Sequence, residues 1–227
     1  MKIIVTITLC LLATVDSLIA TAQIPDVIIY DGKGYNLHNN PMELYFKEFP
    51  GKRPKCDVVS TALWRGYVAT FEFEQDCLFL KDIKVEVILN EEGKEDHFYE
   101  FKSVIDQIIP NGEKLKIKWF SGILVLPHGE LVNYVHMGYE SSYSNYTLLE
   151  VSSGKLTGKR EYKIQEYEAF KERQFEAYQR TEEYKLQLEE FKGEGRTKEF
   201  IDSLIKDHVV GYTAKFLDNE ELSNQLE

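Results

Sequence analysis

Proline divides this chain into two parts. All six prolines lie at or before Pro127, where turns that contain glycine also recur. From about residue 160 onward, glutamate, lysine, glutamine and tyrosine dominate and proline is absent. Because proline is confined to turns, edge strands and helix starts, its positions mark short elements in the first part, whereas the second part can form helices. The sequence therefore predicts a β-rich domain at 23–158 and a helical extension at 159–227.

The aromatic side chains favour a sheet as the main structure of the first part. The chain contains 14 tyrosines and 13 phenylalanines, residue types that are enriched in strands. Apolar residues make up 43% of the 227 residues, which is enough for a packed core. We therefore expect an α+β fold with a mainly antiparallel β-sheet body, short helices, and a C-terminal helical extension that packs on the sheet or projects from it.

Alternating apolar residues predict several strands. Residues 58–73 and 77–89 form a candidate hairpin joined by a short acidic turn. The clearest alternation runs over 115–119, where lysines separate the apolar side chains. The segment 123–137 is predicted as two strands joined by a turn at 127–130, because that turn contains proline and glycine.

Helices are predicted where the apolar spacing is longer. A short helix is expected at 41–49, with proline at its first position, and a second at 98–109. Residues 162–191 have a helical pattern whose apolar face drifts, so this helix bends or meets two surfaces. Thr197 is expected to cap a last helix at 198–207.

The first 22 residues resemble a secretory signal peptide. Lys2 precedes an apolar run at 3–13, and Ala20–Thr21–Ala22 matches an A-x-A cleavage pattern, which places the mature start near Gln23. The run is too short to span a bilayer, so we expect no stable membrane span in the mature chain. The sequence predicts a secreted or periplasmic protein; the alternative is a cytoplasmic protein in which this run is a buried strand.

The net charge restricts the class of partner. The chain carries a formal charge of −11 and has a pI of about 5.1. A protein that binds nucleic acid needs a basic surface for the phosphates, so we expect no nucleic-acid partner. The acidity suits a basic partner and equally suits simple solubility.

Cysteine and histidine spacing predicts no cofactor and no metal. Two cysteines follow the leader, Cys56 and Cys77, and an oxidising compartment would allow one disulfide between them. Two separate buried thiols are the alternative, and neither spacing matches a zinc site or a nucleotide-binding fingerprint. His38, beside Asn39 and Asn40, is interpreted as turn and capping chemistry before the first helix.

The string Y-V-H-M-G-Y-E-S-S-Y at 134–143 contains the most reactive group of side chains in the chain. His136 and Glu140 could perform acid–base chemistry, or they could form a plain hydrogen-bonded pair. Gly138 interrupts the alternation, as at a bulge or a close approach of two backbones. No nucleophile or second metal ligand stands nearby, which disfavours catalysis.

A second unusual string is W-R-G-Y at 64–67. Trp64 and Arg65 are residue types that dominate recognition surfaces. Arg65 could instead stack on an aromatic ring or pair with a carboxylate such as Glu140, as a structural clamp. We favour the clamp.

Three strings in this order resemble a family of uncharacterised bacterial proteins. They are S-T-A-L-W-R-G-Y-V-A-T at 60–70, W-F-S-G at 119–122 and the string at 134–143, with D-C-L-F-L at 76–80 as an accompanying hairpin. The resemblance covers about residues 26–155. It implies a bacterial source and a common fold for that stretch, and it implies no activity. The leader and the helical extension depart from the family pattern.

These observations favour a non-catalytic binding or interaction protein of the bacterial envelope. A protein partner could bind through the C-terminal helix. An immunity-type protein that neutralises a toxin and a hydrolase that uses His136 with Glu140 are the alternatives. The hydrolase requires His136, Glu140 and Arg65 to converge in one pocket. The candidate binding residues are Trp64, Arg65, Tyr67, Trp119, His136, Tyr139, Glu140 and Tyr143.

Overall fold

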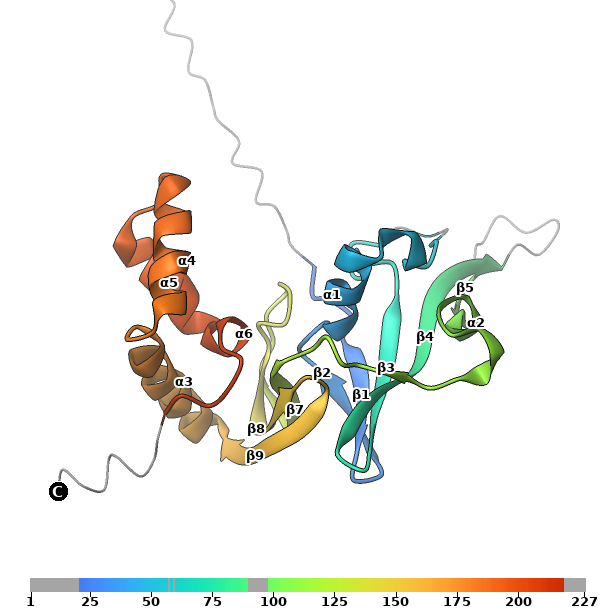
Figure 1. Ribbon diagram of the computed structural model, residues 1–227, viewed down its shortest axis with the longest axis horizontal. Coiled ribbons are helices and arrows are strands. Elements are labelled where there is room, and N and C mark those ends of the chain that lie inside the picture. Colours follow the sequence, from blue (N-terminus) through green and yellow to red (C-terminus); the bar gives the residue numbers. More distant parts are fainter. Residues whose placement is uncertain (1–20, 57, 59, 90–97, 219–227) are drawn as a thin grey trace, which may run out of the picture.

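The protein has an α+β fold, built on one mixed and mostly antiparallel sheet (Figure 1). The computed structural model describes residues 21–218, with the exception of 57, 59 and 90–97. All but the last two positions of the predicted signal peptide lie outside the described residues. Within the described part, no helix is long and apolar enough to cross a membrane.

Nine strands form the sheet within the described residues, in the order β2-β1-β3-β4-β9-β8-β7, with β5 and β6 pairing with β4. β1 and β3 run parallel, and β4 meets β9 through a single pair near the β3–β4 turn. The strands are β1 (Asp26–Tyr30), β2 (Lys33–Leu37), β3 (Val68–Glu74), β4 (Cys77–Leu89), β5 (Phe98–Ser103), β6 (Leu115–Lys116), β7 (Gly122–Asn133), β8 (Ser142–Ser152) and β9 (Lys155–Lys163).

The two end strands of the sheet meet through Asn39. The His38 backbone N–H donates to the Val125 carbonyl oxygen (3.0 Å). Asn39 Oδ1 accepts from the Val125 N–H (2.7 Å), and Asn39 Nδ2 donates to the Ile123 carbonyl oxygen (3.1 Å). The Asn39 amide thus supplies the donor and acceptor that a neighbouring strand would offer to the β7 edge. The sheet is therefore curved, so that the end of β2 lies against β7.

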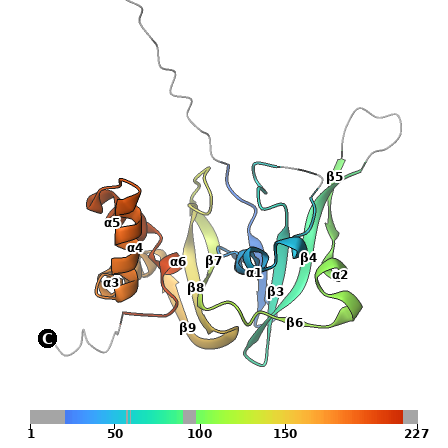
Figure 2. The ribbon, with the colours of Figure 1, turned by 45° about the horizontal axis from the view of Figure 1, so that its top comes forward.

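The curved sheet separates two hydrophobic cores. The inner core lies within the curve of the sheet, and the outer core lies between the sheet and the C-terminal helices. Along β7, Leu124 and Leu126 point into the inner core, whereas Ile123 and Val125 point into the outer core. This alternation follows from the two-residue period of a strand. Helix α1 (Pro41–Glu48) contributes Met42 and Phe46 to the inner core and covers one end of the curved sheet (Figures 1 and 2).

A helical layer covers the outer face of β7, β8 and β9 (Figure 2). Its central side chain is Phe170, which stacks on Tyr162 with ring centroids 5.2 Å apart. Two small helical turns, η1 (Pro50–Lys52) and η2 (Pro110–Gly112), lie in the connections of the body. The helix α2 (Ile105–Ile108) lies against β4 in the sheet body. The helical layer consists of α3 (Ile164–Tyr178), α4 (Glu182–Gly193), α5 (Lys198–Asp207) and α6 (Val209–Tyr212).

The chain after α6 is fixed to the helical layer by a buried carboxylate. Asp218 accepts hydrogen bonds from Arg160 on β9 and from Arg173 on α3. The buried Gln174 side chain donates to the Thr213 hydroxyl (2.9 Å) and accepts from the Leu217 N–H (2.8 Å). These polar groups are paired although they are buried, which avoids the cost of unsatisfied donors and acceptors.

Several predicted elements are confirmed, and each was indicated by residues within the element or directly before it. β4 spans the predicted residues 77–89, and α1 begins at Pro41. Thr197 caps α5 by accepting from the Phe200 N–H (3.3 Å). The long predicted helix at 162–191 breaks into α3 and α4, because Thr181 caps α4 by accepting from the Tyr184 N–H (3.2 Å). The drifting apolar face therefore belongs to two helices.

Two predictions were wrong, because strand pairing overrides local signals. The predicted helix at 98–109 is mostly β5, which pairs with β4 from Lys84↔Ser103 to Leu89↔Phe98, and only α2 is helical. The predicted turn at 127–130 lies inside β7. β7 is an end strand, so Pro127 needs no N–H on its outer side, and Gly129 (φ +84°) forms a bulge opposite β8.

Candidate functional site

A buried arginine lies at the centre of the candidate site. The Arg65 side chain is 3% exposed. Its Nη1 donates to the Tyr139 hydroxyl (2.7 Å), and its Nη2 donates to the Ile24 carbonyl oxygen (2.9 Å) and to Asp26 Oδ1 (3.3 Å). These contacts join the segment before β1, β1 itself and the β7–β8 loop. Arg65 is therefore a structural clamp, and its carboxylate partner is Asp26 rather than Glu140.

Gly66 lets the chain turn immediately after Arg65. Its φ is +80°, a backbone conformation that residues with a side chain rarely adopt, and a Cβ atom here would lie 3.1 Å from Cys56 Cβ. Arg65 and Tyr67 are both buried on either side of it, and the Tyr67 hydroxyl donates to Glu43 Oε1 (2.8 Å). The W-R-G-Y string is thus a turn that brings two polar side chains into the core just before β3.

Burial makes the Asp26 carboxyl hard to ionise. Its Oδ1 accepts from the Ala69 backbone N–H (2.9 Å) as well as from Arg65, and the residue is fully buried. Burial raises the pKa of Asp26 to about 7, because the loss of hydration outweighs the attraction of Arg65. The Asp26 carboxyl therefore holds its proton to a much higher pH than a free aspartate does.

His38 lies beside this clamp, in the connection between β2 and α1. Its ring stacks on Tyr139 with centroids 4.9 Å apart and meets the Tyr143 ring at 6.0 Å. Burial lowers the pKa of His38 to about 4, because the imidazolium would lose its hydration. His38 is therefore neutral at neutral pH. Its neighbour Asn40 accepts from the Tyr139 hydroxyl (3.0 Å) and does not cap α1 with its side chain, which corrects the predicted cap.

We expect Asp26 and His38 to give opposite pH dependences of stability. The folded state binds the Asp26 proton up to pH about 7, whereas the free carboxyl has a pKa of 3.8, so its contribution to stability falls as pH rises through this window. The unfolded state binds the His38 proton below pH 6.5, whereas the folded state resists it down to about 4, so its contribution rises with pH. The two contributions offset each other between about pH 4 and 6.5.

Single substitutions should therefore separate the pH-dependent contributions of Asp26 and His38 to stability, which offset each other in the wild type. Relative to the wild type, Asp26→Asn should gain stability as pH rises over this window, and His38→Gln should lose it, each by at most roughly 1.4 kcal/mol per pH unit. Urea denaturation at several pH values measures both slopes, and His208→Gln, on the exposed surface, provides the control. Variant profiles parallel to that of the wild type would contradict the two assigned pKa directions.

The string at 134–143 forms the loop between β7 and β8 together with the start of β8. The loop is closed by Ser141, whose hydroxyl accepts from the Val135 N–H (3.0 Å) and donates to the Val135 carbonyl oxygen (3.2 Å). Gly138 (φ +49°) pairs with Ala22, and its carbonyl oxygen accepts from the Gln23 N–H (3.0 Å). Gly138 thus marks a close approach of two backbones.

The residues of the hypothesised hydrolase do not converge. His136 is exposed, and its Nδ1 lies 2.9 Å from the Tyr134 hydroxyl in its own loop. Glu140 Oε1 lies 3.7 Å from Nε2 of His208 in the helical layer. Arg65 is buried with Asp26. The arrangement contains no catalytic set built from His136, Glu140 and Arg65.

The other candidate binding residues have different surroundings. Trp64 is 75% exposed, whereas Arg65 and Tyr67 are buried and cannot contact a partner directly. Trp119 is half-buried and donates from Nε1 to the Pro41 carbonyl oxygen (3.0 Å), which holds the start of α1. Tyr139 and Tyr143 pack around His38. Trp119, Tyr139 and Tyr143 therefore support the candidate site from inside the protein.

The hypothesised disulfide is wrong, because both cysteines are free. Cys56 Sγ lies 4.0 Å from the Glu86 carbonyl oxygen, near the far end of β4, whereas Cys77 begins this strand and accepts from Lys116 Nζ (2.9 Å). Nine residues of strand span about 30 Å. A disulfide requires Cα atoms within about 7 Å.

A polar cleft between the sheet and the helical layer is the main feature that sequence reasoning missed. Its volume is about 360 Å³. His38, Tyr139 and Glu140 form one side, and residues of α3 and of the α5–α6 junction form the other. Within the described residues, no three histidine, cysteine, aspartate or glutamate side chains are grouped to hold a metal ion.

Comparison with models of protein families, with curated proteins and with solved structures finds no match to this chain.

Proposed function

We propose that the protein is a non-catalytic binding protein of a bacterial envelope or of the secreted fraction, and that it binds a protein partner through the β7–β8 loop. The A-x-A pattern before Gln23 supports export. The fixed loop with exposed apolar side chains supports binding. The dispersal of His136, Glu140 and Arg65 removes the argument for hydrolysis.

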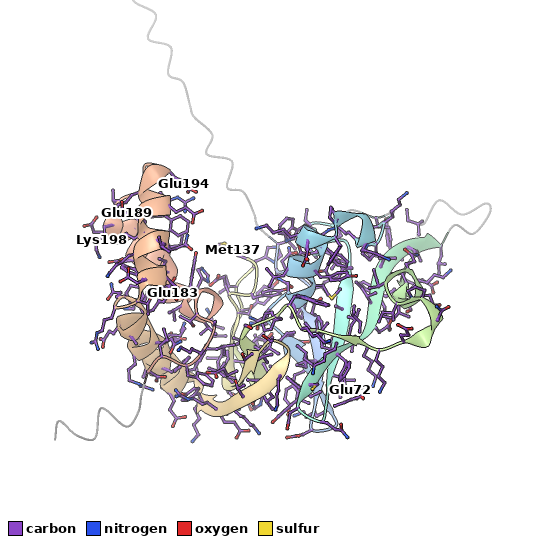
Figure 3. The ribbon with its side chains drawn as sticks, in the orientation of Figure 1. Glu72, Met137, Glu183, Glu189, Glu194 and Lys198 are labelled. Atoms are coloured by element: carbon purple, nitrogen blue, oxygen red, sulfur yellow. The ribbon has the colours of Figure 1, made fainter. Side chains whose placement is uncertain are left out.

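The exposed apolar side chains at the end of β7 and in the loop that follows it carry the proposal. Leu131, Val132, Tyr134 and Met137 are each more than half exposed within seven residues, and Met137 lies at the tip of the loop (Figure 3). Such a group is costly to leave in water unless a partner covers it. Tyrosine and methionine are also enriched in protein interfaces.

The loop is held in place before any partner binds. The buried side chain of Arg65 holds Tyr139, the Ser141 hydroxyl closes the loop, and Gln23 pairs with Gly138. A fixed loop loses little conformational entropy on binding, so more of its contact energy appears as affinity. The clamp therefore serves binding indirectly, by fixing the surface that a partner would meet.

Photo-crosslinking in the native host tests this function. With p-benzoylphenylalanine at Met137, we expect a discrete crosslinked product that excess wild-type protein competes away and excess Tyr134→Asp protein does not. Position Glu72, on the opposite side of the body from Met137 in Figure 3, provides the control and should give no such product. Position Leu186, exposed on α4, tests binding through the helical extension.

Two results would contradict the proposal. The first is the absence of a product from Met137, and the second is the same product from Glu72. A product from Leu186 alone would move the partner to the helical extension. Fractionation of the same cells tests the localisation, since an exported chain should begin near Gln23 and a cytoplasmic chain at Met1.

A further inference from the structure

The cleft between the sheet and the helical layer has the size and composition of a small-molecule site. Its volume of about 360 Å³ lies within the range of ligand sites in proteins, roughly 300–1,000 Å³. Segments far apart in the chain form it: the β2–α1 connection, the β7–β8 loop, α3 and the α5–α6 junction. The β7–β8 loop lines the cleft with Tyr139, Glu140 and Ser141, whereas the surface proposed above to bind a protein partner is formed by other residues, Leu131 to Met137.

The charges in the cleft are predominantly negative. Three carboxylates line it, those of Glu140, Glu168 and Asp207, against the single ammonium of Lys171. Lys171 Nζ is paired with Glu168 Oε2 at 2.8 Å, so it neutralises that carboxylate. The carboxylates of Glu140, in the β7–β8 loop, and Asp207, at the end of α5, both line the cleft, and Glu140 Oε1 also lies 3.7 Å from Nε2 of His208, the residue after Asp207. With neutral histidines, the formal charge of the lining is therefore −2, from three carboxylates and one ammonium.

Aromatic rings form part of the remaining wall, beside Val125 and Val210. Tyr146 and Tyr167 stack with centroids 4.1 Å apart, and His38 is stacked on Tyr139. The neutral imidazole of His38 adds no positive charge to the cleft and offers one ring nitrogen as an acceptor. Tyr146 and Tyr167 are buried, and the Lys171 ammonium lies 5.3 Å from the centroid of the Tyr167 ring beside Glu168, so this wall already holds one cationic group between an aromatic ring and a carboxylate.

From this geometry we infer that the cleft binds a small organic cation with an amine or guanidinium group, held between Glu140 and Asp207. The net charge of −11 on the whole chain attracts such a ligand from solution. A metal ion fits less well, because the described residues contain no group of three or more ligating side chains.

Titration with agmatine, which carries a guanidinium and an amine, tests this inference. Calorimetry should detect binding, and NMR should show shifts of the His38 ring and of the Gly211 amide, both in the cleft lining. Glu140→Gln and Asp207→Asn should each weaken binding about threefold to fivefold, as expected for partly exposed ion pairs. Raising the ionic strength from about 0.01 M to about 1 M should also weaken it, since salt screens these charges.

Matched probes and a matched variant decide the outcome. Butylurea, which is neutral, and glutarate, which is anionic, should not shift the cleft resonances. Glu189→Gln on α4, outside the cleft lining, changes the net charge equally and should leave affinity within about twofold. The inference is overturned if agmatine shifts no cleft resonance, if butylurea binds as tightly, or if Glu189→Gln weakens binding as much as Asp207→Asn. Tighter binding of Ca²⁺ alone would assign the cleft to a metal ion instead.

Discussion

Replacing Arg65 by methionine is expected to lower the free energy of unfolding by about 3–5 kcal/mol. Methionine keeps an unbranched apolar stem but removes the guanidinium that joins Ile24, Asp26 and Tyr139. The carboxyl of Asp26 and the hydroxyl of Tyr139 would lose a donor in surroundings that water does not reach freely. Urea denaturation at neutral pH, monitored by tryptophan fluorescence, measures the decrease in the free energy of unfolding.

Lys81→Met provides the matched control for Arg65→Met. Lys81 also loses its cation, but its pair with Glu72 (2.8 Å) lies on the surface, so the cost should stay below about 1 kcal/mol. If Arg65→Met cost no more than Lys81→Met, the clamp would not stabilise the fold. A normal stability together with a loop that proteases cleave readily would instead restrict the role of Arg65 to the β7–β8 loop.

The elements that could be predicted are those whose signals lie within a few residues. The strand at 77–89 follows from alternation after an acidic turn, and α5 from a threonine cap before an amphipathic segment. The strand β5 could not be predicted in the same way. Its aromatic residues suit a strand, but neither Tyr99 nor Phe101 is buried, and the segment becomes a strand because β4 continues far enough to pair with it.

The clamp shows why the candidate site could be only partly predicted. The sequence indicates that Arg65 needs an opposite charge, and its alternatives included a carboxylate partner. The choice of Asp26 depends on the parallel pairing of β1 with β3, which places two residues 39 positions apart in contact. The cleft is harder still, because His38, Glu140 and Asp207 come from three elements and share no local pattern. Only the packing of the helical layer on the sheet brings them together.

That packing depends on a side chain whose replacement should have the second large effect. Phe170→Ala is expected to cost about 3–5 kcal/mol, because Phe170 is 0% exposed and contacts the rings of Tyr162 and Phe216. Phe200→Ala on α5 makes the same chemical change at a side chain that is 56% exposed, so it should cost less than about 1 kcal/mol. Urea denaturation compares the two variants.

Two probes then show whether the sheet and the helical layer unfold together. Both tryptophans, Trp64 and Trp119, lie in the sheet body, whereas most of the helix signal in circular dichroism comes from α3, α4 and α5. β7 and β8 contribute side chains to both cores, so loosening the outer core should destabilise the inner one. We therefore expect Phe170→Ala to shift both transitions equally. A shift of the circular dichroism transition alone would mean that the helical layer unfolds independently, and the cleft would then be lost before the sheet unfolds.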